Sequence, residues 1–258
     1  FAKGSAGSGG RDIFLAKWNK SGENQWFEMV GGPKNEKAYA VTVDSSNGDI
    51  YVAARTASPK IDGVKNPNGS GGGLSGVVMR YDSAGDKKWL DIFGSPTTDS
   101  AVGVAYDSQR KAVYVSGDTL GRFGGRTKPG GFDGFLVRYS RKGKQKWVRL
   151  FGNGSTNDSL FRVAVDESTG AVYTAGKSEG DFYRDPNTGG FDIATLKFSA
   201  KGVRKWTKLE GTPADEAVFD IVVDEQTSDY YLAGWTEGSL PGCCERGQRD
   251  AFWMRRKD

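Results

Sequence analysis

Residues 132–176 read FDGFLVRYSRKGKQKWVRLFGNGSTNDSLFRVAVDESTGAVYTAG, and this stretch decides the fold. It holds four short segments rich in β-branched and aromatic residues, at 135–140, 146–151, 161–166 and 171–176. Gly, Asn, Asp, Ser and Lys fill the spacers between them, a composition typical of turns and loops. The stretch therefore predicts four consecutive short β-strands.

The same unit recurs along the whole chain of 258 residues. One position of each copy holds a tryptophan, at intervals of 63, 58 and 59 residues: Trp26, Trp89, Trp147 and Trp206. A second position holds an aspartate, followed seven residues later by a tyrosine: Asp44, Asp107, Asp166 and Asp224. A turn position holds a glycine, which indicates a positive φ angle: Gly22, Gly85, Gly143 and Gly202. These markers define about four and a half copies of a unit of 58–63 residues.

Many of the strand segments carry apolar residues on both faces, whereas a strand packed on one side alternates apolar and polar residues. This pattern, with four strands in each unit, predicts an all-β fold: a β-propeller of four-stranded antiparallel blades. We expect a single domain over 1–258, with complete blades at 38–94, 101–152 and 160–210 and three-stranded partial blades within 1–37 and 217–258. Such a ring is open, so we expect further residues or other chains to complete it.

Antiparallel pairing places the connections alternately on two sides of such a disc. The turn side carries the short turns, such as Arg141–Lys144. The loop side carries the long connections, at 57–74, 120–131, 178–190 and 237–249, which differ from copy to copy. Variable loops held by rigid strands are the usual place for binding in repeat scaffolds.

The copies RDIFLAKWNKSGENQW, FDGFLVRYSRKGKQKW and FDIATLKFSAKGVRKW, each followed by a VTVD-, VAVD- or IVVD-type strand, resemble the SBBP β-propeller repeat. The resemblance covers essentially the whole chain. It implies a secreted or cell-surface propeller, usually part of a larger multi-domain protein. The basic turns and the long loop Ala57–Gly73 depart from the usual pattern of the family.

Composition excludes several classes of function. The chain has no histidine, which removes Ser-His-Asp and Cys-His catalysis and histidine metal sites. No apolar run is long enough to cross a bilayer, and the formal net charge is only +4. No nucleic-acid-binding motif accompanies the basic residues. We therefore expect neither an enzyme, nor a nucleic-acid partner, nor a transmembrane segment.

Each copy carries an acid eight residues before its framework aspartate: Glu36, Asp99, Asp158 and Glu216. In a propeller these side chains would stand where the chain enters the innermost strand, as a ring at the loop side. Such a ring could hold a hard cation such as calcium, or a basic partner; beyond this calcium option we expect no cofactor. Alternatively, each acid accepts hydrogen bonds from loop amides in its own blade.

The short turns of three copies are basic, and together they would form a positive arc on the turn side. The arc could contact a sulfated polysaccharide, an acidic protein or a phospholipid surface, or it could simply be a solvated rim. Its members are Lys87, Lys88, Arg141, Lys142, Lys144, Lys146, Lys201, Arg204 and Lys205.

Three further features bear on function. Trp26, Trp89, Trp147 and Trp206 recur with the fold and are expected in the core, whereas Trp18, Trp235 and Trp253 lie outside that position and are candidates for a ligand surface. The adjacent Cys243 and Cys244 could form a strained vicinal disulfide, remain as thiols or bond to another chain. Sequons stand at Asn19, Asn68, Asn153 and Asn157, and we favour Asn68 and Asn153 for glycosylation.

These features predict a non-catalytic structural or adhesive module of the extracellular space or cell surface, which binds protein or polysaccharide partners through its loops. The first alternative is a carbohydrate-binding lectin, which would need an aromatic residue and an acid in equivalent pockets. The second is a propeller enzyme, such as a glycosidase with paired carboxylates or a quinoprotein.

Overall fold

The chain forms an all-β structure, seen in a computed structural model that describes residues 2–4, 9–69, 73–123, 130–152, 155–182, 185–241 and 248–258. These residues contain twenty strands and no helix. Eighteen of the strands belong to five sheets that follow one another along the chain, and the other two form a separate hairpin. No helix in this part of the chain offers the length and apolarity that a membrane span requires.

Three sheets have four antiparallel strands in chain order, as the repeat predicts. Sheet 2 contains β4 (Glu36–Val43), β5 (Ile50–Thr56), β8 (Ser75–Tyr81) and β9 (Lys87–Phe93). Sheet 3 contains β10 (Asp99–Asp107), β11 (Ala112–Thr119), β12 (Asp133–Ser140) and β13 (Gln145–Phe151). Sheet 4 contains β14 (Asp158–Asp166), β15 (Ala171–Ser178), β16 (Asp192–Ser199) and β17 (Arg204–Glu210). Each sheet starts two residues earlier than predicted, at its acidic residue.

The outer sheets have three strands each. Sheet 5 contains β18 (Glu216–Val223), β19 (Tyr230–Thr236) and β20 (Asp250–Arg256) in chain order. Sheet 1 contains β1 (Ala2–Gly4), β2 (Ile13–Trp18) and β3 (Asn24–Val30), and here the order predicted for a blade is wrong. β1 lies parallel to β3 on its outer edge instead of pairing with β2. The outer edge of β3 offers unpaired backbone groups, which a short strand can satisfy.

The long connection between β5 and β8 contains an unpredicted hairpin, β6 (Lys60–Ile61) and β7 (Val64–Lys65). Ile61 is fully buried in the cluster between sheets 1 and 2, so the hairpin covers apolar surface. At its tip, the Asp62 carboxylate forms a 2.7 Å ion pair with Lys87 Nζ, which anchors the hairpin to β9.

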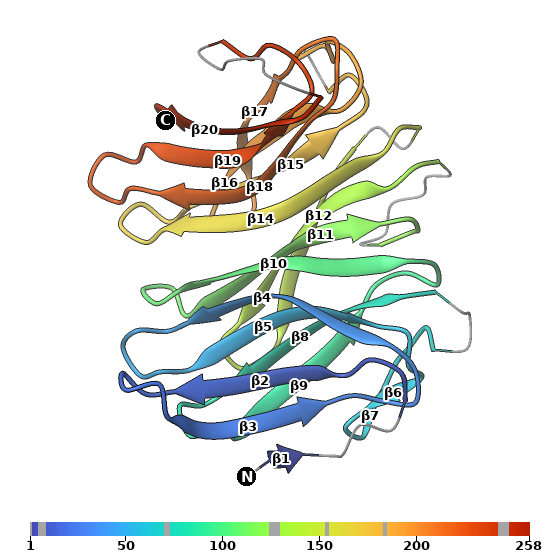
Figure 1. Cartoon of the computed structure of the whole chain (residues 1–258), viewed down its shortest axis with the longest axis vertical. Helices are drawn as coiled ribbons and strands as arrows, with labels where there is room; N and C mark the ends of the chain where they lie inside the picture. Colours follow the sequence, from blue (N-terminus) through green and yellow to red (C-terminus); the bar gives the residue numbers. More distant parts are fainter. Residues whose placement is uncertain are drawn as a thin grey trace.

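The five sheets stack face to face in sequence order, from blue at the bottom to red at the top of Figure 1. Their first strands lie beside one another, because β10 contacts β4 on one side and β14 on the other, and β14 contacts β18. A separate hydrophobic cluster fills each of the four spaces between sheets. β5 is buried on both faces, which explains why the strands do not alternate. The turns that follow β2, β4 and β10 project on the left of Figure 1.

Neighbouring sheets interlock through the repeated tryptophan and glycine. Each indole lies against the turn glycine of the next sheet: Trp26 on Gly85, Trp89 on Gly143 and Trp147 on Gly202. A Cβ built at these glycines would come within 2.8–2.9 Å of the indole. Their φ angles are 76–86°, which confirms the predicted positive φ. The glycine is therefore required twice, by its own turn and by the tryptophan of another copy.

The framework aspartates shape the turn between the first and second strands. Asp166 Oδ1 accepts hydrogen bonds from the Ser168 amide at 3.0 Å and the Thr169 amide at 3.1 Å. Its Oδ2 accepts a 2.8 Å bond from Ser228 of the next sheet. Burial opposes its ionisation, but these hydrogen bonds outweigh burial and hold the pKa of Asp166 at about 2. The aspartate therefore links a local turn to the neighbouring copy.

Candidate binding surfaces

The turn side carries the predicted basic arc, and ion pairs neutralise part of it. Lys87 pairs with Asp62 at 2.7 Å, and Lys88 pairs with Asp82 at 2.5 Å. Arg141 crosses from the β12–β13 turn to Asp49 of sheet 2, with Nη2 at 2.5 Å and Nε at 2.9 Å from Oδ2. These three cations therefore stabilise the fold through ion pairs, in addition to contributing charge to the surface.

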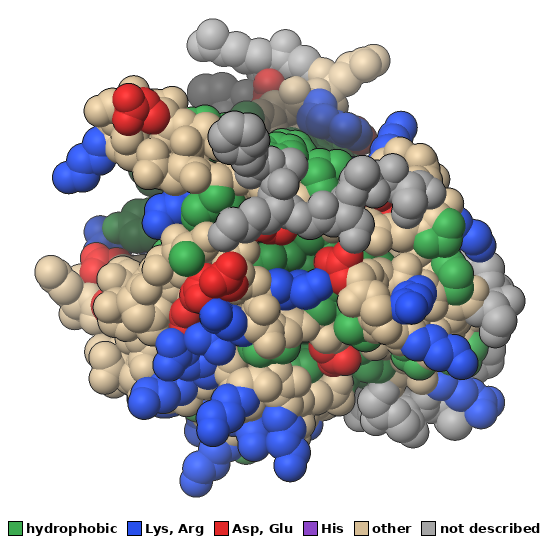
Figure 2. Space-filling view, turned by 90° about the horizontal axis from the view of Figure 1, so that it is seen from below, with side chains coloured by type: hydrophobic (Ala, Val, Ile, Leu, Met, Phe, Trp, Pro, Cys, Tyr) green, Lys and Arg blue, Asp and Glu red, His purple; other side chains and the backbone are tan. Residues whose placement is uncertain are grey.

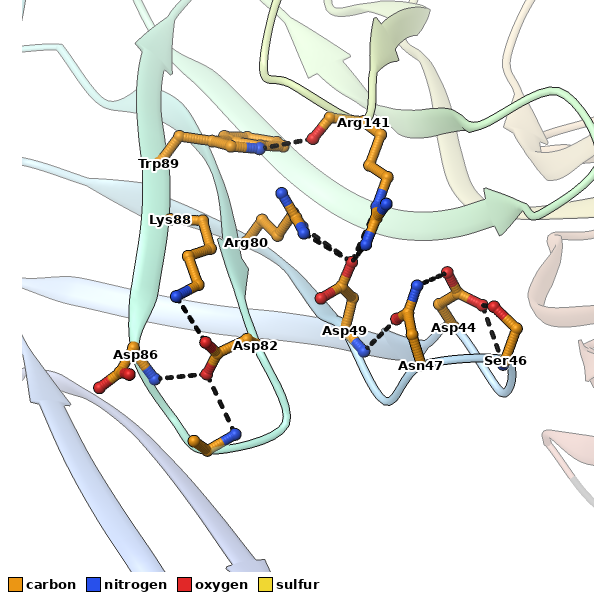
Figure 3. Close-up of polar contacts among 11 residues, drawn as sticks. Asp44, Ser46, Asn47, Asp49, Arg80, Asp82, Asp86, Lys88, Trp89 and Arg141 are labelled. Carbon is orange, nitrogen blue, oxygen red and sulfur yellow. Dashed lines mark hydrogen bonds and ion pairs between the residues drawn. The ribbon is translucent and has the colours of Figure 1, made fainter.

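Asp49 is the centre of a link between sheets that the sequence did not reveal (Figure 3). Its carboxylate, only 5% exposed, also accepts bonds from Arg80 of its own sheet at 2.7 and 3.0 Å. The Arg141 carbonyl in turn accepts a 2.8 Å bond from Trp89 Nε1. Arg80 and Arg141 are thus held by one buried carboxylate, and sheets 2 and 3 are joined at their turn side.

Five members of the arc remain exposed, and their side chains form no ion pair with the part of the chain that the structure describes: Lys142, Lys144, Lys146, Lys201 and Lys205. Arg204 is half-buried and stacks over the Phe182 ring at 5.4 Å. In Figure 2, basic side chains gather at the lower left, on the side of the short turns.

The structure brings two of these lysines together at a groove of about 350 Å³ in sheet 4. Lys201 and Lys205 line it with Lys197, whose Nζ is paired with Asp258. Thr169 and Ser199 are polar residues at the wall, and Phe198 supplies an apolar surface. Two uncompensated cations beside hydroxyl groups and an apolar floor form a surface suited to an anionic group on a larger molecule.

The four acids of the predicted ring are all described, and each is engaged in its own sheet. Glu36 accepts bonds from the Gly32 amide at 2.9 Å and from Thr56 Oγ1 at 2.7 Å. Asp99 accepts from the Ser95 amide at 2.7 Å, and Asp158 accepts from the Ser178 hydroxyl.

Glu216 accepts from the Thr212 amide at 2.8 Å and from Thr212 and Thr236 hydroxyls at 2.7 and 2.8 Å. Nowhere in the described ranges do three or more Asp or Glu residues gather as a metal site would need. Glu36, Asp99 and Glu216 therefore correspond to the alternative interpretation, in which the acid accepts a hydrogen bond from an amide of the loop before its own first strand. Asp158 is likewise engaged within its own sheet, by the Ser178 hydroxyl.

The loop side holds a charged cluster of Arg55, Asp118 and Lys177 that the sequence did not indicate. These three residues, and Trp235 of sheet 5, occupy one position of the repeat, since each pairs with the second residue of the next strand. The signal in the sequence is that two cations, an acid and a tryptophan stand at one framework position. Asp118 Oδ2 accepts a 3.3 Å bond from Ser159 of sheet 4, and the Arg55 guanidinium lies 5.5 Å from the centre of the Tyr39 ring.

Burial dominates the electrostatics of this cluster. It raises the pKa of Asp118 to about 6, although the Ser159 hydrogen bond and the Arg55 charge oppose the rise. Burial also lowers the pKa of Lys177, against the charges of Asp215, Glu179 and Asp118. A carboxyl group that titrates near neutral pH beside variable charged residues is a candidate for ligand contact.

We expect Asp118→Asn to stabilise the protein at neutral pH by roughly 1–2 kcal/mol, after allowance for partial exposure. Between pH 4 and 6 the folded Asp118, with its pKa of about 6, binds more protons than an unfolded aspartate. Stability therefore falls as the pH rises through this window, and the asparagine variant lacks that part of the slope. Urea unfolding of both proteins at several pH values measures the difference; parallel stability curves would contradict it.

The remaining predicted residues fall in different places. Trp253 on β20 and Trp18 on β2 are 76% and 54% exposed, whereas Trp235 lies half-buried under the Arg249 guanidinium, 3.8 Å from its ring centre. Cys243, Cys244 and Asn153 lie outside the described residues. The Asn68 Nδ2 atom, to which a glycan would be attached, is buried. Glycosylation at Asn68 would require its turn to open.

Comparison with known proteins matches one segment of the chain to a family model. Residues 146–183 match the family model described as SBBP, Beta-propeller repeat. The match runs through β13, β14 and β15, and it confirms the predicted resemblance for this segment.

The chain is also similar to "Regulatory protein FlaEY" of Caulobacter vibrioides, with 28% identity over 172 residues. The alignment covers 62% of this chain and 18% of the relative. The chain thus spans less than a fifth of the length of that protein.

Proposed function

We propose that this chain, which carries the SBBP β-propeller repeat at residues 146–183, is a non-catalytic propeller module of the extracellular space or cell surface that binds an anionic partner along its turn side. The five sheets supply rigid, repeated blades with their short turns on one side. The partner that we propose is an acidic polysaccharide, with an acidic protein surface as the second class to test.

The observation that carries the proposal is the groove of sheet 4. Lys201 and Lys205 are exposed there, and Lys142, Lys144 and Lys146 of the adjacent sheet carry the same charge on the same side. Ion pairs within the fold neutralise three other turn-side cations, Lys87, Lys88 and Arg141. Cations without a partner in the fold are available to a ligand at little desolvation cost.

Charge reversal at the groove is expected to weaken binding to a sulfated polysaccharide. The Lys201→Glu and Lys205→Glu double variant should lose roughly tenfold or more in affinity, and binding of the parent chain should weaken as salt rises. Fluorescence anisotropy with a labelled heparin-like oligosaccharide measures both effects, and an acidic protein competitor distinguishes the two classes of partner.

The matched control is Lys60→Glu with Lys65→Glu, two exposed lysines on the β6–β7 hairpin. This variant has the same net charge as the groove variant. If both variants lost affinity equally, binding would follow net charge alone and the groove would have no special role.

A further inference from the structure

The inner edge of β2 is unpaired at the backbone. In sheets 2 to 4 the third strand, β8, β12 or β16, pairs with a second strand on one edge and with the outermost strand on the other. β2 is the equivalent strand of sheet 1, and among the described residues it pairs only with β3. An open edge of this kind can accept another strand by β-sheet hydrogen bonding.

An apolar surface beside this edge is exposed, although the equivalent surfaces are buried. Val41 on β4 is 58% exposed, whereas the same position in the next three sheets, Val104, Val163 and Ile221, is 8%, 7% and 4% exposed. Val43, two residues further along β4, is 56% exposed, against 8% for its equivalent Tyr106. Among sheets 2 to 5, only sheet 2 therefore has this face of its first strand exposed.

The open edge and the exposed surface face one groove of about 320 Å³. Phe14, Ala16 and Trp18 of β2 line one wall, and Ala38, Tyr39, Ala40 and Val41 of β4 line the other. The groove is lined mainly by apolar side chains. Its apolar lining and the open strand edge beside it therefore favour a β-structured occupant with apolar side chains over a charged one.

The three equivalent interfaces show what chemistry fits. Between sheets 2 and 3, Tyr51 and Ala53 of the second strand and Ala40 of the first strand pack on Val104 and Tyr106. The Tyr51 and Tyr106 rings stack at 4.6 Å. Tyr114 and Tyr173 occupy the place of Tyr51 in the next two clusters, in which Ala105 and Ala164 of the first strands also pack. The cover is always the first and second strands of the preceding unit, with a tyrosine and an alanine facing the next sheet.

We infer that the β2–β4 groove is a docking site for a β-hairpin built from the first and second strands of another unit of this same repeat. The second strand of the hairpin pairs with the open edge of β2, and its tyrosine covers Val43. This inference concerns a surface remote from the basic groove, and it does not depend on the proposed anionic partner.

The test supplies the hairpin in the same polypeptide. In a variant chain, a second copy of residues 158–178, which form β14, β15 and their turn, is joined to residue 5 in place of residues 1–4. Hydrogen exchange, followed by mass spectrometry, then reports on β2. We expect exchange in residues 13–18 to slow about tenfold or more, because an open edge becomes a central strand. The outer edge of β20 pairs with no other strand among the described residues, so it is the internal control, and its exchange should not change.

Two variants make the result specific. Val41→Glu with Val43→Glu changes two exposed side chains, so the chain should still fold, but a charge in the groove should abolish the added protection. An aspartate in place of the tyrosine in the grafted copy of residue 173 should do the same. If the grafted chain still protected sheets 3 and 4 from exchange but β2 exchanged as fast as in the parent chain, the inference would be overturned. Protection of β2 in the unmodified chain that rises with protein concentration would assign the groove to a second copy instead.

Discussion

Replacing Gly143 with alanine is expected to lower the free energy of unfolding by about 3 kcal/mol, whereas the same change at Gly22 should cost only about 1 kcal/mol. Both glycines have nearly the same backbone, with φ angles of 80° and 79°. A Cβ at Gly143 would lie 2.8 Å from the Trp89 indole, but a Cβ at Gly22 would meet no atom within 4 Å. Both alanine variants have the energetic cost of a left-handed backbone, but only the variant at Gly143 adds a collision between sheets.

Urea or thermal unfolding of the two variants measures this difference directly. Trp89 is also held by its 2.8 Å bond to the Arg141 carbonyl, so it cannot move aside without losing a hydrogen bond. Equal destabilisation by the two alanines would mean that the turn alone requires glycine. The interlock between sheets would then contribute nothing.

Removal of the Glu216 carboxylate should have a comparable effect. Glu216 is fully buried and accepts hydrogen bonds from one amide and two hydroxyl groups, of Thr212 and Thr236. Glu216→Ala leaves these donors without an acceptor, at an expected cost of about 2–4 kcal/mol. Glu225→Ala removes an exposed acid of the same chemistry and should change the stability by about 0.5 kcal/mol or less.

Calcium distinguishes this structural role from the metal-binding one. If Glu216 only closes its loop, the unfolding midpoint of the parent chain should not respond to added calcium or to EDTA. A rise of the midpoint with calcium that is lost in Glu216→Ala would contradict the structural role, because a ligand that binds only the folded state must stabilise it.

The fold was largely predictable from the sequence because its signals are local and repeated. Trp89, Asp107 and Gly143 each stand at a fixed place in a unit, and the alternation of strand and turn chemistry is visible within any one copy. The repeat therefore gave the strands, their order in the three central sheets and the positive φ of the turn glycines. The edge at which β1 pairs was not predictable, since a strand of three residues carries too little pattern to select its neighbour.

The candidate surfaces were only partly predictable, because charge in the sequence does not reveal pairing in space. Arg141 and Asp49 are 92 residues apart, yet they form one ion pair, so a predicted surface cation became a link between sheets. Lys201 and Lys205 lie close together in the sequence, and both line one groove of the structure. Asp118 was not predictable because its raised pKa comes from burial, and because Ser159 and Arg55, which oppose the rise, belong to other sheets.

The stacking of one repeated sheet on the next is tested most directly by NMR. Nuclear Overhauser contacts should connect the indole protons of Trp26, Trp89 and Trp147 with the α-protons of Gly85, Gly143 and Gly202, respectively, and ring currents should shift those glycines upfield. Gly22 should show no contact with any indole. Tryptophans that contact only their own unit, with all four glycines at ordinary shifts, would contradict the stacked arrangement.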